Sequence, residues 1–356
     1  MSDVLMKTGA YGTTNSGEIS YRTAGYAVAQ LLKRGRSRLI LDRFGQRHPM
    51  PKNKTTTIAF RRYNSLQPAT TPLSEGVTPD AIGIDYEDVK ATLKQYGAHM
   101  RLTNVIQDTH EDPVLRVMSE LAGEQAADTL EQLHFNALMG GTNVFYAGGV
   151  NSRAEVAKAV SLNDFRKVAR SFLKQKAAYI TEIVGATPKI ATEPIGYSFI
   201  AICSTDLEAD IRNIPGFVPV EKYSASMRAM QYELGKVENF RVLTSTFFDP
   251  WLESGAAVVG RLSGGSPAQT SDGSSTTDKA DVYPILCLAR DAYGVTPLSG
   301  YNNAHISVLN PGKATKDDPH GQRGFVAWDV WDALCILNEA WMARIECACS
   351  DLSETE

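Results

Sequence analysis

Polar and apolar residues alternate along residues 54–103 and predict two extended strands that carry little apolar surface of their own. Side chains in a strand point alternately to its two faces, so the first strand is expected over 55–63 and the second over 82–102. The connecting loop is rich in Pro and Gly, which favour turns. An isolated two-stranded hairpin is marginal in water. The pattern therefore predicts a protruding hairpin that needs contacts from outside it, most simply from another copy of the chain.

The segment that follows has the most regular apolar pattern of the chain and predicts one long helix over 112–140. Asp112 is suited to cap its first turn, Pro113 to its first position, and Gly140 to its end. The expected buried face recurs every three or four residues and consists of Val114, Met118, Leu121, Gln125, Leu130, Leu133 and Ala137. At 1.5 Å per residue the helix would be about 40 Å long, so we expect other elements to pack along it.

Shorter elements alternate after this helix and predict a compact mixed α/β domain. Helices are expected over 162–176, begun by Ser161 or Asn163, and over 204–212. Strands are expected over 197–201, 241–246 and 283–289. A proline-containing loop is expected over 214–220, and a surface loop rich in Ser, Gly and Thr over 263–278. The apolar segment 325–346 is predicted to form strands that cover the long helix.

Residues 1–52 are predicted to form an extended arm, polar and Gly-rich at first and then amphipathic. This arm carries a basic cluster, Lys33, Arg34, Arg36 and Arg38. Such a cluster either contacts nucleic acid or forms a solvated face, which in an assembly pairs with acidic groups of a neighbouring subunit. The pattern leaves these alternatives open.

Composition narrows the class of protein. The 356 residues, 43% hydrophobic and 21% charged, are enough for a sizeable core and for two domains or one elaborated domain. The net charge of -4 argues against a DNA-wrapping protein. Five cysteines scattered through apolar segments favour reduced, buried thiols and a reducing compartment. No apolar run has the roughly 18 residues that a membrane helix needs, and we expect a soluble protein made in the cytosol, without a membrane partner.

Three clusters of chemically active side chains occur, and none has the spacing that a catalytic or metal site needs. His110, with its acidic neighbours, lacks a second histidine four residues on. Cys347 and Cys349, two residues apart, are expected to point the same way into a core. The Ser-Gly-Gly-Ser turn at 263–266 is not followed by the Lys of a phosphate-binding loop, and no Gly-x-Ser-x-Gly elbow is present. We therefore predict no catalytic, cofactor-binding or metal-binding residues.

Four strings in the C-terminal half resemble a viral family. They are RNIPGFVPVEKY at 212–223, LGKVENFRVLTS at 234–245, YPILCLARDAYGVTPL at 283–298 and ALCILNEAWMARIE at 333–346. In order and spacing they are similar to the major capsid proteins of tailed bacteriophages, in the family typified by phage N-four. The resemblance implies an α+β protein with the HK97-like capsid fold: an N-terminal arm, an extended β-hairpin loop, a peripheral domain with a long spine helix, and a mixed α/β axial domain.

The resemblance also implies a division of the chain and a function. The arm would be 1–52, the extended loop 53–104, the axial domain 161–300, and the peripheral domain 105–160 with a return over 301–356. The chain would be a structural protein without catalytic activity, which self-assembles as pentamers and hexamers into an icosahedral head shell around phage DNA. Scaffolding, portal and decoration proteins would be further partners, contact with DNA would be non-specific, and the protein would be made in the bacterial host cytoplasm before entering the virion.

Four basic residues of the predicted hairpin are candidate contacts between subunits: Arg61, Arg62, Lys90 and Lys94. We expect them to fix the register of a neighbour through complementary carboxylates rather than to add much affinity. Two other functions stay open on the residues alone. One is a soluble α/β enzyme with an oligomerisation arm, whose site would lie under the 263–278 loop, and the other is a virion decoration or tail protein.

Overall fold

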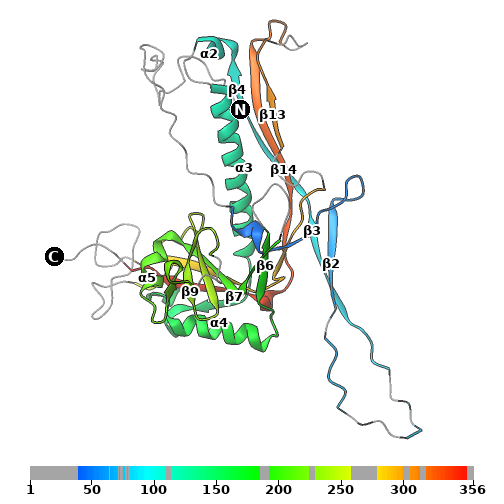
Figure 1. Ribbon diagram of the computed structural model, residues 1–356, viewed down its shortest axis with the longest axis vertical. Coiled ribbons are helices and arrows are strands. Elements are labelled where there is room, and N and C mark those ends of the chain that lie inside the picture. Colours follow the sequence, from blue (N-terminus) through cyan, green and yellow to red (C-terminus); the bar gives the residue numbers. More distant parts are fainter. Residues whose placement is uncertain are drawn as a thin grey trace, which may run out of the picture.

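The computed structural model describes residues 39–63, 65–70, 72, 75–76, 78, 81–109, 114–184, 192–223, 229–257, 279–299, 305–312 and 318–350. Figure 1 shows three parts: a long helix beside a narrow sheet, a compact domain at the foot of that helix, and a two-stranded hairpin that extends away from both. The predicted arm before residue 39, the 263–278 loop, and residues 110–113 with His110 and the proposed cap Asp112 lie outside the described residues.

The long helix is α3, Val114–Leu138, and its prediction is confirmed. It lies along a narrow three-stranded antiparallel sheet with the order β13 (His305–Leu309), β14 (Arg323–Asp332) and β4 (Lys94–Thr103). A short helix, α2 (Asn104–Thr109), directly follows β4. The first half of α3 buries Ala122 and Ala126 against Val326 and Trp328 of β14. Its last turns place Phe135 in a second core, so α3 connects the sheet to the compact domain (Figure 1).

The buried face of α3 differs from the predicted one after the first two turns. Val114 and Met118 are buried as expected, but the face then continues through Ala122, Ala126, Glu131, His134, Phe135 and Leu138. Of the other predicted positions, Gln125 and Ala137 are exposed, and Leu121, Leu130 and Leu133 are only partly buried. Two properties explain the difference. Small alanines allow a strand to approach closely, and buried polar residues are tolerated when they have hydrogen-bond partners, whereas the prediction counted large apolar residues.

The predicted hairpin is shorter than expected because its return strand belongs to two sheets. Strand β2 (Thr57–Tyr63) pairs with β3 (Tyr86–Thr92) over seven residue pairs, from Thr57 with Thr92 to Tyr63 with Tyr86. Leu93 is buried and interrupts the strand, and β4 then pairs with β14 instead. The prediction of one strand over 82–102 was therefore wrong. Polar and apolar residues alternate in the same way through β3 and β4, so the pattern does not show where one strand ends and the other begins.

The compact domain is built on an eight-stranded mixed sheet, here called the central sheet. Seven of its strands form a continuous path, and the eighth, β6 (Ile180–Val184), pairs with β7. The path is β5 (Val144–Tyr146), β16 (Met342–Ala348), β11 (Val282–Leu288), β7 (Thr192–Ser204), β10 (Phe240–Ser245), β9 (Glu233–Val237) and β8 (Val218–Pro219). The predicted strands at 241–246 and 283–289 are confirmed as β10 and β11. The one at 197–201 is part of the longer β7.

Among the described residues, two α-helices belong to this domain, and both were predicted. Helix α4 (Leu162–Lys174) begins after Ser161, whose backbone N–H and hydroxyl both donate to the Asp164 carboxylate. It buries Phe165 and Phe172 on one face of the central sheet. The 204–212 helix is a 3-10 turn, Thr205–Leu207, followed by α5 (Glu208–Arg212). The remaining 3-10 turns are Leu41–Arg43, Ala147–Gly149, Arg153–Glu155, Val220–Lys222 and Glu339–Trp341.

The 325–346 segment does not lie entirely on α3, in contrast to the prediction. Strands β14 and β15 (Leu334–Ile336) do lie against α3, and β15 also pairs with β12 (Tyr293–Val295), which pairs in turn with β1 (Gln46–Arg47). Strand β16 then pairs with β11 inside the central sheet. Strand β16 mixes apolar residues with Arg344 and the buried Glu346, and its partners are distant in sequence, so its local pattern does not reveal which sheet it joins. Cys347 and Cys349 are buried in the central core as predicted, and all five cysteines are free.

Candidate assembly interface

The far end of the hairpin exposes large apolar side chains that the chain itself does not bury. The exposed fractions are 62% for Tyr63, 56% for Leu66, 64% for Ile82, 68% for Ile84 and 55% for Tyr86. Figure 1 shows this end lying well away from the central sheet and from α3. Clustered apolar exposure of this kind marks a surface that another molecule covers.

Charged pairs across the hairpin fix its register. Arg61 donates two hydrogen bonds to Asp88, at 2.8 and 2.9 Å, and its guanidinium lies 4.0 Å from the centre of the Tyr86 ring. Arg62 donates to Glu87 at 2.5 Å. These residues lie directly opposite one another in the β2–β3 register. The hydrogen bond from Arg61 lowers the pKa of Asp88, so the carboxylate stays ionised in acid more readily than an ordinary aspartate does. Such pairs hold two thin strands in one alignment.

The structure does not bring the four predicted contact residues together. Arg61 and Arg62 have acidic partners within their own hairpin, and Lys90 is exposed on β3 opposite Ala59. Lys94 begins β4, opposite Asp332, and so belongs to the narrow sheet. Lys90 lies in the hairpin and Lys94 outside it. A contact of any of the four with another subunit stays a prediction.

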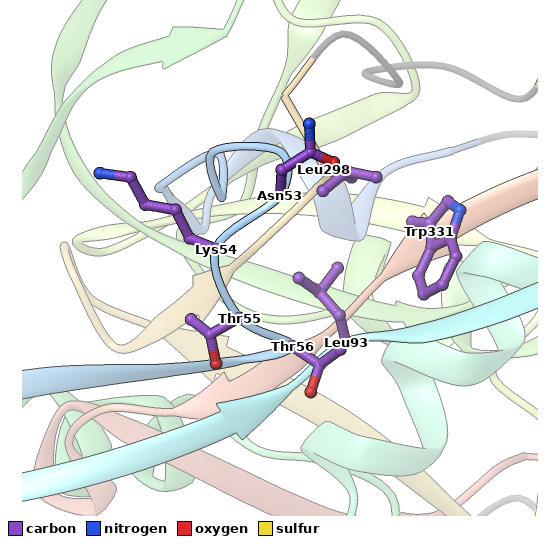
Figure 2. A pocket seen from close by; sticks show the side chains of 7 residues that line it. All are labelled: Asn53, Lys54, Thr55, Thr56, Leu93, Leu298 and Trp331. Atoms are coloured by element: carbon purple, nitrogen blue, oxygen red, sulfur yellow. The ribbon is translucent and has the colours of Figure 1, made fainter.

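The base of the hairpin contains an open cavity of about 310 Å³, shown in Figure 2. Leu93, Leu298 and Trp331 supply its apolar surface, and residues Asn53, Lys54, Thr55 and Thr56 line the remainder. The backbone N–H of Leu93 donates to the carbonyl oxygen of Thr56 at 2.8 Å, which closes the base of the two strands. Three segments that are distant in sequence therefore meet here: the hairpin, the chain after β12, and the end of β14.

A buried polar cluster attaches the first described residues to α3. The carboxylate of Glu131 accepts hydrogen bonds from the backbone N–H groups of Ile40 at 3.0 Å and Leu41 at 3.2 Å. One turn further along α3, His134 Nε2 lies 2.7 Å from Asp332 Oδ2. The Tyr293 hydroxyl donates to the carbonyl oxygen of Leu41. Sequence reasoning missed this cluster, and its one signal was two polar residues at helical spacing beside the apolar face of α3.

Burial governs the protonation of this cluster. It raises the pKa of Glu131 to about 7, against the effect of the backbone N–H groups of Leu41 and Ile40, which lower it. Burial lowers the pKa of His134, but the hydrogen bond to Asp332 and its negative charge outweigh burial, so the pKa is raised. His134 Nδ1 has no hydrogen-bond partner among the described residues. The cluster attaches Ile40 and Leu41 to α3, and none of its residues lines the hairpin cavity.

The described part of the chain holds no group of three or more side chains able to bind a metal ion. Of the clusters that the sequence offered for chemistry, His110 with its acidic neighbours and the 263–266 turn lie outside the described residues. Across the residues that the structure describes, no helix is both long and apolar enough to cross a membrane.

Comparison with known proteins agrees with this arrangement. The model of a family described as phage capsid protein matches residues 86–297, more than half of the chain. The major capsid protein of Pseudomonas phage KPP21 is 24% identical over 277 residues, covering 72% of this chain and 67% of that protein. The capsid of Ralstonia phage GP4 aligns over 99% of this chain and 100% of its own, with a TM-score of 0.60 and 11% identity.

The head of Helicobacter pylori bacteriophage KHP40 aligns over 95% of this chain and 99% of its own, with a TM-score of 0.59 and 11% identity. At such identity these two likenesses concern the fold, and they confirm the α+β, HK97-like class. The chain belongs to the phage capsid protein family. It is a structural major capsid protein of a bacteriophage, located in the virion, and copies of it assemble into the shell.

Proposed function

We propose that this chain forms pentamers and hexamers of a closed icosahedral shell around phage DNA, and that each hairpin lies across the neighbouring subunit. The observation that carries the proposal is a preformed hairpin with an exposed apolar end. Ionic pairs set its register, yet Ile82 and Ile84 are 64% and 68% exposed. A hairpin of two strands is marginal alone, so the contacts it lacks would come from the next copy.

The remaining partners and roles follow as parts of the same proposal. The subunit would work without catalysis of its own, after synthesis in the bacterial host cytoplasm. Scaffolding, portal and decoration proteins would meet the shell, and contact with DNA would be non-specific, in keeping with a net charge of -4. We keep the proposed division into an arm, an extended loop, a peripheral domain and an axial domain. Two strands would change place: β4, counted above in the 53–104 loop, would join β14 in the peripheral sheet, and β16, counted above in the 301–356 return, would contribute to the axial one.

A truncated hairpin tests the proposal. Tyr63 and Tyr86 are opposite residues, so replacing 64–85 with Asn-Gly would close β2 and β3 by a two-residue turn. Deleting the whole of 55–102 would be a poor test, because it removes most of β4 from the narrow sheet. We expect the truncated chain to fold, with circular dichroism and a melting temperature close to those of the full chain, but to sediment as small species without shells.

The matched control keeps the full loop and replaces only Leu66, Ile82 and Ile84 with serine. Loss of shells in this variant too would assign the effect to apolar contacts and not to loop length. Normal shells from the truncated chain would overturn the proposal that the hairpin joins neighbouring subunits.

A further inference from the structure

We infer that the cavity at the base of one hairpin receives Ile82 and Ile84 from the hairpin loop of an adjacent copy, while Lys54 on its rim pairs with Asp85 of that loop. This inference rests on the proposed function and deepens it, because it names the two surfaces that meet.

The cavity suits aliphatic side chains. Leu93 is only 6% exposed and, with Leu298 and Trp331, offers apolar surface, as Figure 2 shows. A cavity of about 150 Å³ holds a benzene molecule, so a volume near 310 Å³ has room for two branched aliphatic side chains. The rim residues 53–56 are exposed, so the cavity is accessible from solvent.

The hairpin loop carries a matching group. Ile82 and Ile84 flank Gly83, and in an extended segment side chains two residues apart lie on the same side. They are the two most exposed aliphatic side chains of the described hairpin. The aromatic residues nearby already have contacts, since Tyr63 and Tyr86 pack edge to face and Arg61 covers the Tyr86 ring. The isoleucines are thus the apolar groups that an outside surface would cover.

Charge complements shape at the same place. Arg61 and Arg62 pair with Asp88 and Glu87 inside the hairpin, whereas Asp85 is exposed and directly follows Ile84. On the receiving side, the Lys54 side chain extends from the rim of the cavity (Figure 2). An isoleucine seated in the cavity would bring the backbone of Asp85 to the rim, where the Asp85 carboxylate, on the other side of the extended segment from Ile84, would be met by the long Lys54 side chain. The pair would set orientation more than affinity.

The hairpin's own loop does not reach its own cavity. The cavity lies beside Thr56 and Leu93, at one end of the β2–β3 pairing, and the loop leaves from Tyr63 and Tyr86 at the other. Seven residues of strand separate the two ends by about 20 Å at roughly 3.3 Å per residue. Ile82 and Ile84 seated here would therefore come from another copy, and a chain that carries both surfaces makes a head-to-tail contact, the kind that closes rings.

Disulfide trapping tests the contact. The variant with Lys54→Cys and Ile84→Cys is assembled, oxidised, and run on a non-reducing gel beside each single variant, which controls for the native cysteines. The matched control pairs Ile84→Cys with Val308→Cys, since Val308 is exposed on β13 in the narrow sheet. We expect a ladder of linked subunits, at least tenfold above the control, that disappears on reduction.

Shells that form without linkage above the control would overturn the inference and leave the proposed function intact. Failure of the unchanged chain to form shells would instead overturn the proposed function.

A charge exchange tests the contact if the double-cysteine chain does not assemble. Lys54→Asp and Asp85→Lys should each reduce the shell yield at least fivefold, and the double exchange should restore it. No restoration would count against the contact.

Discussion

Glu131 shows how a single buried acid positions the start of the described chain. Its carboxylate accepts two backbone N–H groups, from Ile40 and Leu41, at a site from which solvent is excluded. Buried N–H groups without a partner cost about 1–3 kcal/mol each. The residue therefore helps to decide where the chain before β1 attaches to α3, while His134 and Asp332 attach the same helix to the end of β14.

Glu131 makes the stability of the folded chain depend on pH. The pKa of Glu131 is raised from 4.5 to about 7, so its protonated form favours the folded state. This contribution is complete below the unfolded pKa and is lost as the pH rises through 7, and the raised pKa of His134 acts in the same direction. The free energy of unfolding should fall between about pH 5 and pH 8, with about 3 kcal/mol from Glu131.

Urea unfolding of the unassembled chain across that range measures this slope. Glu131→Gln stays neutral at every pH and should flatten most of it, leaving the part due to His134. Parallel curves for the two chains would show that Glu131 does not titrate in this range.

For single residues, the sequence predicted the burial of apolar side chains better than the burial of polar ones. Cys347 and Cys349 were placed correctly because two thiols on alternate residues of an apolar segment have few other roles. Glu131 and His134 were missed, because their burial depends on Ile40, Leu41 and Asp332, which lie between 90 and 198 residues away in the chain. Periodicity carries no information about such distant partners.

Among the elements, β4 is the one whose role changed most. It follows the hairpin directly, yet it pairs with β14 over ten residues and lies against α3. Its centre is tightly packed, because a Cβ atom at Gly97 would lie 2.6 Å from the carbonyl oxygen of Trp328. The long helix α3 and the next long helix along the chain, α4, were predictable from local signals. The change of partner at Leu93 was not, because alternation is the same in either sheet.

A pair of glycine substitutions tests this packing. Gly97→Ala should destabilise the chain by about 1–3 kcal/mol, since the added methyl group forces β4 away from β14. Gly123→Ala is the matched control on α3: its Cβ would have only the Ile306 Cδ1 atom, at 3.8 Å, nearby among the described residues. It should be neutral or stabilising by up to about 1 kcal/mol, because alanine favours helix. Chemical denaturation compares the two, and equal effects would contradict the described sheet.

For the whole molecule, the described parts form two packed regions connected by α3, with the hairpin projecting from their junction (Figure 1). The strands β1, β5, β6, β8, β9, β12 and β13 were not predicted. The existence of the hairpin, of the long helix and of the longer central strands could be predicted from periodicity. The sheet membership of β16 could not, because it pairs with β5 and β11, which are far away in sequence. The same limit applies to the hairpin cavity, whose lining residues come from three separate segments.

The central claim is that the hairpin joins one subunit to the next in a closed shell. The most direct test is an electron cryomicroscopy reconstruction of shells assembled from the purified full chain, at a resolution that traces individual strands. We expect closed icosahedral shells in which β2 and β3 of every subunit lie across an adjacent copy, with the 81–85 segment buried in that contact. Closed shells whose hairpins point into solvent, or contact only their own subunit, would contradict it.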